Sequence, residues 1–410
     1  MDHTSLLSAL TAALEITPQA GNATQDFIWT LYQAADEPSY ADQRLVRLLE
    51  QLRMCPELEV FNEGLQVVAH TSCMVDYPSL ARWLLGRAVQ VGAEQTLDNL
   101  QQFLAASDIP YRMTLVLGGI ALDSSCTLGQ NITLLPWEEL PDSQGKSRAF
   151  EMLTGPDGVA PDCPTAALVR DIALPRRNVT QTEWRQGAHN LAPVDYTDLR
   201  DALLCIGLVG PVAPYELVTW LEPPEWAPIL GVCLGSPFPE GYIPSSQWPS
   251  DAAMQVRELC ERFSQLSKSH KELMRLRMQR LNSAMRRRNP VDAAIDLGIT
   301  LESLFLNDPD RGELTFQLRL RAARVLGQDE EDRARVFTLV NDLYTVRSAA
   351  VHSGRPPTAP KFRKHLQATY GAEPIEKLFE AGFSLAAQAI NYFLQKGEPR
   401  KEDWTKIILA

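Results

Sequence analysis

Apolar side chains recur at helical spacing through most of residues 254–395, and this pattern predicts a bundle of amphipathic helices. Asn289-Pro290 ends the first apolar stripe, because the residue before a proline disfavours helical backbone. Gly327 is expected just after the end of the third helix, and Ser353-Gly354 with two following prolines ends the fourth. Short connections favour antiparallel neighbours and hence a compact bundle. The five predicted helices cover residues 254–288, 291–306, 314–326, 329–353 and 374–395.

Charge divides the chain into two parts. Residues 251–410 contain 26 basic and 21 acidic residues, whereas residues 1–250 contain 13 basic and 30 acidic residues, so the net charges are +5 and −17. This shift predicts a domain boundary near residue 250, and only the C-terminal part attracts a polyanion unaided. The alternative interpretation is a solvated basic bundle beside an acidic neighbour, without functional meaning.

The first 250 residues predict a mixed α/β region. Residues 1–108 are expected to be mainly helical, with helices at 24–35, 40–54 and 78–106 and a strand pair around 58–67. Residues 109–250 are rich in turns, with strands expected at 113–117, 131–135 and 167–172. Nine prolines and three tryptophans from 211 to 249 predict an ordered, irregular connector, because the aromatic rings need burial. The fold class is therefore α+β, with a mixed α/β N-terminal region of one or two domains followed by an all-α bundle.

Several classes of protein are excluded by the distribution of residue types. The longest uncharged stretch has 15 residues, whereas a bilayer span needs roughly 20 apolar residues. The N-terminus lacks the basic segment of a signal peptide, so we expect a soluble, cytoplasmic protein with no membrane partner. The seven cysteines and six histidines are scattered and form no C-x-x-C motif, so neither a metal site nor a disulfide framework is expected, and no cofactor is implied.

Two polar side chains occupy apolar stripes of the predicted bundle. Glu302 shares a face of the second helix with apolar residues, and Arg321 does so in the third helix. A buried carboxylate is unfavourable unless it is paired, so Arg321 is the expected partner of Glu302. Such a pair either fixes the register of the helices or lets the arginine reach past the carboxylate toward a phosphate.

An arginine and a histidine lie close together at the end of the fourth helix. Arg347 and His352 are five positions apart, which places their side chains about 140° apart on an ideal helix. They converge only if the helix loosens at its end, as Ser353-Gly354 favours. An arginine beside a titratable histidine suits phosphodiester cleavage, because the arginine stabilises transition-state charge and the histidine moves the proton. A chain with this many arginines contains such a spacing by chance, so the spacing alone indicates nothing. The interpretation rests on the position of the pair at a helix end in the basic region.

Three ordered blocks resemble the Apea-like branch of the HEPN superfamily (higher eukaryotes and prokaryotes nucleotide-binding domains). The blocks read Ile-Asp-Leu-Gly-Ile-Thr-Leu-Glu-Ser-Leu-Phe at 295–305, Leu-Arg-Leu-Arg-Ala-Ala-Arg-Val-Leu-Gly at 318–327, and Leu-Tyr-x-x-Arg-Ser-x-x-x-His-x-Gly at 343–354. Asp403-Trp404 and residues 407–409 resemble the C-terminal tail of that branch, which docks on the bundle. The resemblance covers roughly residues 254–410.

The resemblance implies a homodimeric helical bundle with a metal-independent endoribonuclease site at the dimer cleft. Arg347 would stabilise the scissile phosphate, and His352 would act as general acid or base, leaving a 2′,3′-cyclic phosphate. Glu302 matches the acidic position of the second helix, and Ser348 stands where active members often have Asn, Asp or His. The implied catalytic residues are thus Arg347, His352, Ser348 and Glu302, and the implied RNA-binding residues are Arg319, Arg321, Arg324 and Arg355.

The same resemblance suggests a role in prokaryotic anti-phage defence. The implied partners are RNA, with tRNA as one candidate, a second copy of the chain, and a phage-derived trigger. The acidic N-terminal region would then sense infection and restrain the nuclease, because a −17 module beside a +5 domain competes with RNA. Two alternatives stay open: a non-catalytic HEPN scaffold for nucleotide binding or dimerisation, and a purely structural helical protein.

Overall fold

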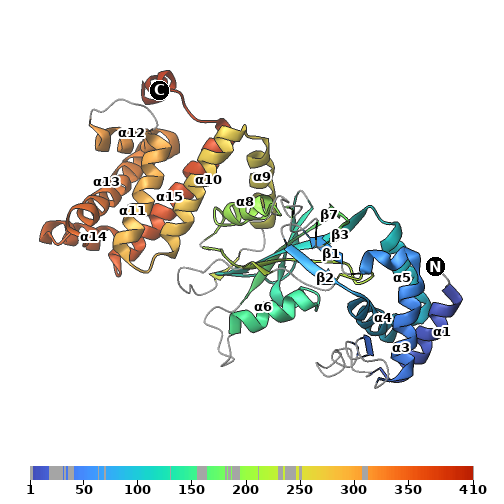
Figure 1. The fold of residues 1–410 in the computed structure, drawn as a ribbon. Helices are drawn as coiled ribbons and strands as arrows, with labels where there is room; N and C mark the ends of the chain where they lie inside the picture. The colour runs from blue at the N-terminus through green and yellow to red at the C-terminus, as the bar shows by residue number, and fades with distance from the viewer. Residues whose placement is uncertain are drawn as a thin grey trace.

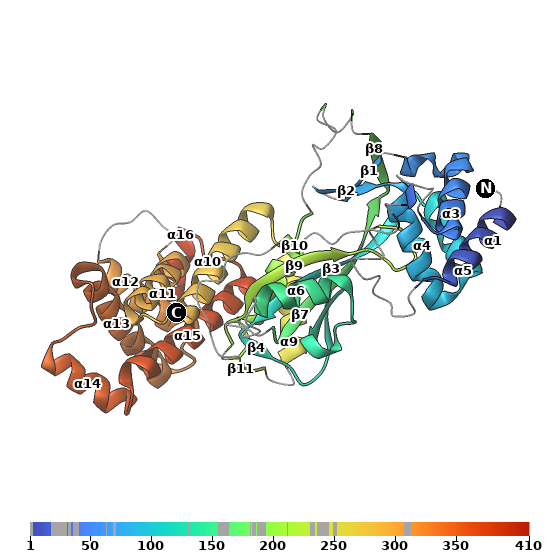
Figure 2. The ribbon, with the colours of Figure 1, turned by 60° about the horizontal axis from the view of Figure 1, so that its bottom comes forward.

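The computed structural model places an antiparallel sheet between two groups of helices (Figures 1 and 2). The N-terminal helices lie on one side of this sheet and the C-terminal bundle lies on the other. The fold is α+β, as the sequence predicts. The structure describes residues 3–17, 31, 34–35, 41–62, 64–68, 71–129, 131–154, 164–180, 182, 186, 194–210, 212–229, 234–235, 246–248, 252–306 and 313–409.

Four helices pack together in the N-terminal part: α1 (His3–Leu14), α3 (Gln43–Met54), α4 (Tyr77–Val91) and α5 (Ala93–Ala105). The helix predicted over 40–54 is confirmed as α3, and α1 was not predicted. The single helix predicted over 78–106 is wrong, because Gly92 has a φ of +87° and separates α4 from α5. Most of the helix predicted at 24–35 lies outside the described residues.

The predicted strand pair lies later in the chain than expected. A short 3₁₀ helix, Pro56–Phe61, occupies the start of the predicted range. The antiparallel strands β1 (Gly64–Val68) and β2 (Thr71–Val75) follow it, and β8 (Arg177–Thr180) pairs with the other edge of β1.

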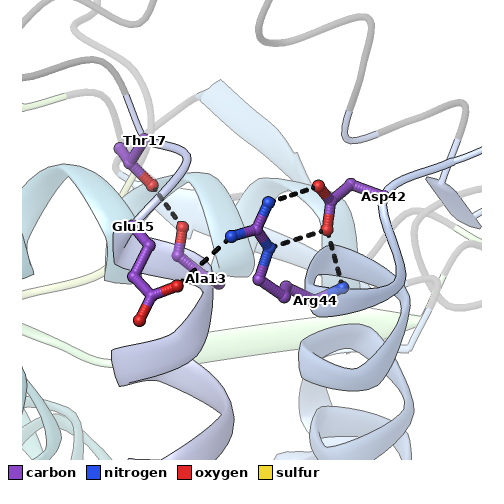
Figure 3. Close-up of polar contacts among 5 residues, drawn as sticks. All are labelled: Ala13, Glu15, Thr17, Asp42 and Arg44. Atoms are coloured by element: carbon purple, nitrogen blue, oxygen red, sulfur yellow. Dashed lines mark hydrogen bonds and ion pairs between the residues drawn. The ribbon is translucent and has the colours of Figure 1, made fainter.

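Polar contacts around Arg44 hold the end of α1 against the start of α3 (Figure 3). The Asp42 carboxylate caps α3 by accepting from the backbone N–H of Arg44, and it also accepts two bonds from the Arg44 guanidinium at 3.0 and 2.8 Å. The same guanidinium donates to Glu15 at 3.2 Å, and the Thr17 hydroxyl donates to the carbonyl of Ala13. These bonds from Arg44 lower the pKa of Asp42 to about 2.

A six-stranded antiparallel sheet forms the middle of the molecule, in the order β10-β9-β3-β7-β6-β5. The three strands predicted in this region are confirmed as parts of β3, β6 and β7. The irregular connector predicted from 211 to 249 is wrong in part, because β9 (Tyr215–Glu222) pairs with β3 inside the sheet. Two of its three tryptophans are buried as expected, with Trp220 1% and Trp248 5% exposed, whereas Trp226 is only partly buried. The remaining strands are β3 (Asp108–Gly118), β4 (Ile120–Ala121), β5 (Cys126–Gly129), β6 (Ile132–Pro136), β7 (Ala166–Pro175), β10 (Leu234–Gly235) and β11 (Ser246–Gln247).

Helices cover this sheet and lead into the bundle. α6 (Gln144–Thr154) packs on β9, whereas α9 (Ala252–Gln265) packs on β5 and on α8 (Thr197–Ile206). A single 3₁₀ turn, Trp137–Glu139, follows β6. The helix predicted over 254–288 is wrong as one element, because Ser267 caps a new helix, α10 (Lys268–Arg286), through the backbone N–H of His270. The first helix beyond residue 250 therefore contacts the sheet, and the domain boundary at this position stays a prediction.

The bundle contains the predicted helices as α11 (Pro290–Phe305), α12 (Leu314–Leu326), α13 (Glu330–Ser353) and α15 (Pro374–Lys396). Two further helices, α14 (Pro360–Tyr370) and α16 (Lys401–Leu409), were not predicted as separate elements. Gly327 follows α12 with a φ of −79°, so it is not a left-handed cap. A Cβ at Gly327 would instead lie 2.5 Å from Cγ of Arg333, so close packing requires glycine there. No helix of the described chain is long and apolar enough to cross a membrane.

Candidate functional site

The side chain of Arg347, from α13, packs against α11 at Gly298. A Cβ built on Gly298 would lie 2.6 Å from Cγ of Arg347, closer than any real contact of this kind. A glycine inside a helix is less favourable than alanine by about 1 kcal/mol, so the close approach of the arginine stem explains the residue. Gly298 belongs to the sequence block at 295–305, but no role was predicted for it. Its only signal was a glycine inside a strong helical pattern.

The guanidinium of Arg347 pairs with Glu302. Its Nη2 donates to Oε2 of Glu302 at 3.2 Å, and its central carbon lies 5.4 Å from the ring centroid of Tyr344. The two paired side chains are 25% and 27% exposed. Glu302 therefore sits at the edge of the bundle and takes its partner from α13. The predicted pairing of Glu302 with Arg321 is wrong.

Arg321 is a structural residue of the bundle. It is 5% exposed, and its Nη1 donates to the carbonyl of Phe305 at 2.8 Å. Its guanidinium also lies 4.7 Å from the ring of Trp404, which is 2% exposed and packs near Phe305. The C-terminal tail thus docks on the bundle, as the resemblance implies. The RNA-binding role expected for Arg321 is wrong, because its guanidinium has almost no exposed surface.

Arg347 and His352 do not converge within one chain. α13 stays helical through Ser353 and ends at Gly354, which has a φ of +65° and donates to the carbonyl of Ala350. The expected loosening of the helix is therefore wrong, and the two side chains leave the helix about 140° apart. His352 is exposed, and Ser348 between them is partly exposed.

The basic residues of α12 lie toward the other end of α13. Arg319 stacks on Phe337, with 3.8 Å between the guanidinium and the ring, and burial lowers the pKa of this arginine. Phe337 precedes His352 by 15 residues, which is about 22 Å along a helix. Arg324 lies closer still to the start of α13, because Gly327 packs on Arg333. Of the four predicted RNA-binding arginines, only Arg355 lies at the same end of α13 as His352, and it is exposed.

A second polar cluster, absent from the sequence predictions, joins α13 to α14. The carboxylate of Asp342 is 1% exposed, and its Oδ2 contacts Nε2 of His365 at 2.9 Å and the hydroxyl of Tyr370 at 3.2 Å. Burial, and then the charge of Asp342, raise the pKa of Tyr370. The buried carboxylate orients an exposed imidazole, an arrangement able to accept a proton. The only sequence signal was an acid with Leu339 and Val346 one helical turn away on either side.

The described residues contain no group of three or more His, Cys, Asp or Glu side chains placed to hold a metal ion. The candidate site therefore consists of Arg347, its contacts Gly298, Tyr344 and Glu302, and the exposed His352 on the same helix. Comparison of the chain with protein-family models, with curated proteins and with solved structures gave no match.

Proposed function

We propose that this protein is a metal-independent endoribonuclease of the HEPN type that acts as a homodimer. The observation that carries the proposal is the packing of the three helices that bear the resembling blocks. α11 and α12 both pack against α13, and Trp404 of the tail is buried against the same bundle. Gly298 and Glu302 hold Arg347 where α11 crosses α13, and His352 and Arg355 are exposed at the end of α13.

The proposed chemistry needs two subunits. Within one chain Arg347 and His352 point apart, so a second copy is required to bring a histidine beside an arginine. His352 then takes the proton of the ribose 2′-hydroxyl, the 2′-oxygen attacks phosphorus, and the 5′-oxygen leaves with a proton from the partner subunit's His352. Arg347 stabilises the charge of the phosphorane-like transition state, and the product carries a 2′,3′-cyclic phosphate. Arg355 holds the RNA backbone beside the histidine.

The acidic region of residues 1–250 is proposed to restrain this nuclease in the cytoplasm until phage infection supplies a trigger. Its net charge of −17 competes with RNA for the bundle, whose net charge is +5. RNA cleavage after release would then serve abortive infection, with tRNA as one candidate substrate.

A non-catalytic HEPN scaffold, binding a nucleotide or supporting dimerisation, is the second candidate. It is favoured by the commitment of the Arg347 guanidinium to Glu302 and Tyr344, which gives the arginine a structural role. In that case His352 would be an ordinary exposed residue at a helix end.

The experiment compares the full chain with His352→Ala and His270→Ala on total RNA and tRNA in EDTA, with end-group analysis. His270 is a matched control, because it is also an exposed histidine on a bundle helix. Loss of RNA in phage-infected cells, measured for the same three proteins, covers the case of a required trigger. Cyclic-phosphate ends that disappear only in His352→Ala support the nuclease. Intact RNA in both assays, or equal cleavage by all three proteins, favours the scaffold.

A further inference from the structure

A cleft opens in the N-terminal region where α4 meets the sheet. Its volume is about 690 Å³, and small-molecule sites typically measure roughly 300–1,000 Å³. One wall is a face of α4, and the other walls come from the start of β3, the end of β9 and the segment before α6. The cleft is thus built jointly by the N-terminal helices and the sheet, far along the chain from Arg347.

The wall from α4 is open at its middle. Arg82, Gly86 and Gln90 line the cleft four residues apart, with Trp83 and Arg87 beside them. A Cβ at Gly86 would meet no atom within 4 Å. Glycine inside a helix is unfavourable by about 1 kcal/mol relative to alanine, and at this position no packing requires it. Its effect is to leave space between the two arginines.

The arginines of this wall retain unused hydrogen-bonding capacity. Arg82 makes no hydrogen bond or ion pair with any residue in the described part of the chain. Arg87 is 14% exposed and donates to Gln90 and to Glu225, which is itself 80% exposed, while its buried Nε has no acceptor among the described residues. A buried donor without a partner is costly, so an incoming acceptor is favoured in the cleft.

The carboxylates of the cleft are already engaged. Asp142 pairs with Lys146, Asp171 lies 3.5 Å from Arg112, and the exposed Glu225 accepts from Arg87 at 2.6 Å. Glu222 accepts from the Ser143 hydroxyl, from the backbone N–H of residue 145 and from the indole of residue 220. Burial raises the pKa of Glu222, and these three hydrogen bonds oppose that shift. Among the described residues, Arg82 is therefore left as a positive charge of the cleft with no carboxylate partner, within a region of net charge −17.

We propose that this cleft binds a small organic anion that carries a planar ring, of the nucleoside phosphate class. Arg82 and Arg87 hold the phosphate, because guanidinium groups pair with phosphate oxygens in a bidentate manner. Trp83, which is partly buried against the core and also lines the cleft, stacks on the ring. The assignment is independent of the proposed nuclease, since it uses none of the residues of the bundle.

Calorimetric titration of the full chain tests the assignment with the common ribonucleoside mono- and triphosphates. Adenosine, ribose 5-phosphate and inorganic phosphate separate the contribution of the ring from that of the phosphate. A nucleotide is expected to saturate one site per chain, and the ring alone and the phosphate alone should each bind at least about tenfold more weakly. Equal affinity for inorganic phosphate would overturn the ring-binding part and leave a simple anion site.

Three variants locate the site within the chain. Arg82→Ala should weaken nucleotide binding about tenfold, because it removes a charge-assisted contact without breaking any bond to a described residue. Gly86→Leu should abolish binding by filling the cleft, whereas Arg47→Ala, which removes an exposed arginine of α3 that does not line the cleft, is the control and should bind as the parent does. Circular dichroism verifies that each variant is folded. Failure of every nucleotide to bind the folded parent, or unchanged binding in both Arg82→Ala and Gly86→Leu, would overturn the assignment.

Discussion

Gly298 and Arg347 form a pair in which one residue makes room for the other. Gly298→Ala places a methyl group 2.6 Å from Cγ of Arg347, in the middle of its stem, so the arginine must move. We expect a loss of about 1–3 kcal/mol in the free energy of unfolding, as for other overpacked sites. Urea denaturation of the full chain measures this loss.

A double-mutant cycle assigns the loss to the arginine. In an Arg347→Ala background the clash is absent, and replacing a helical glycine by alanine becomes favourable by up to about 1 kcal/mol. The sign of the Gly298→Ala effect should therefore reverse between the two backgrounds. A loss of equal size in both backgrounds would mean that Arg347 is not what requires the glycine.

The lowered pKa of Asp42 predicts that the stability of the chain depends on pH. Its pKa is about 2 in the folded chain against an ordinary 3.8, so the unfolded chain binds protons first as the pH falls. The stabilisation is present in full above the ordinary pKa and is lost as the pH falls through about 2. Asp42→Asn keeps a capping side chain but loses the charge. Its melting temperature should lie below that of the parent at pH 7 and approach it near pH 2. A difference that stays constant with pH would mean that the charge of Asp42 is not the source of the stabilisation.

At the scale of elements, α16 packs on the bundle through the buried ring of Trp404, with Ile407 partly buried beside the same core. Trp404 is 2% exposed and lies against Phe305 and Arg321. Trp404→Ala should cost about 3–5 kcal/mol, because it empties a buried site and uncovers the arginine. Leu409→Ala on the same helix is the control, since Leu409 is 80% exposed and should change stability by less than about 0.5 kcal/mol. If Trp404→Ala and Leu409→Ala lower the free energy of unfolding by similar amounts in chemical denaturation, the tail is not docked through the ring of Trp404.

Helices that combine a signal at their start with a strong apolar pattern could be predicted from the sequence, as α11, α13 and α15 show. α11 and α15 begin at a proline, and the acidic residues at 330–332 mark the first turn of α13. The break between α9 and α10 was missed, because Ser267 caps a helix inside a continuous apolar pattern. β9 was missed for a different reason: the prolines around it suggested irregular backbone, although its pairing with β3 supplies the order.

The candidate site was predictable only in its parts. The sequence identified Glu302 and Arg347, but their pairing depends on where α13 crosses α11, which no local pattern specifies. Arg321 illustrates the same limit, since burial under Trp404 changes it from a candidate ligand-binding residue to a structural one. The cluster at Asp342 requires α14, which begins at a proline and is followed by Gly371 but buries only Leu366, so its apolar pattern is weak and the cluster was missed.

At the scale of the whole molecule, α10 joins the acidic region to the basic bundle. Arg275 of α10 donates to both carboxylate oxygens of Asp201 in α8, at 2.6 and 2.8 Å. Further along the helix, the Asn282 amide donates to the carbonyl of Pro214 at 2.8 Å, and the Arg286 guanidinium lies 4.6 Å from the ring of Tyr215. The change of charge near residue 250 therefore does not separate two mechanically independent units.

This coupling predicts one cooperative thermal transition for the parent chain and two for a variant with a weakened joint. Arg275→Ala leaves Asp201, which is 13% exposed, without its arginine, and Asn282→Ala leaves a buried carbonyl unsatisfied. In differential scanning calorimetry, the double variant should split the transition, so that the van't Hoff enthalpy falls below the calorimetric one. Arg262→Ala, which breaks only an exposed pair with Glu258, should keep the single transition. If the double variant melts earlier but still in one transition with equal enthalpies, then α9 and the shared apolar core carry the coupling instead of α10.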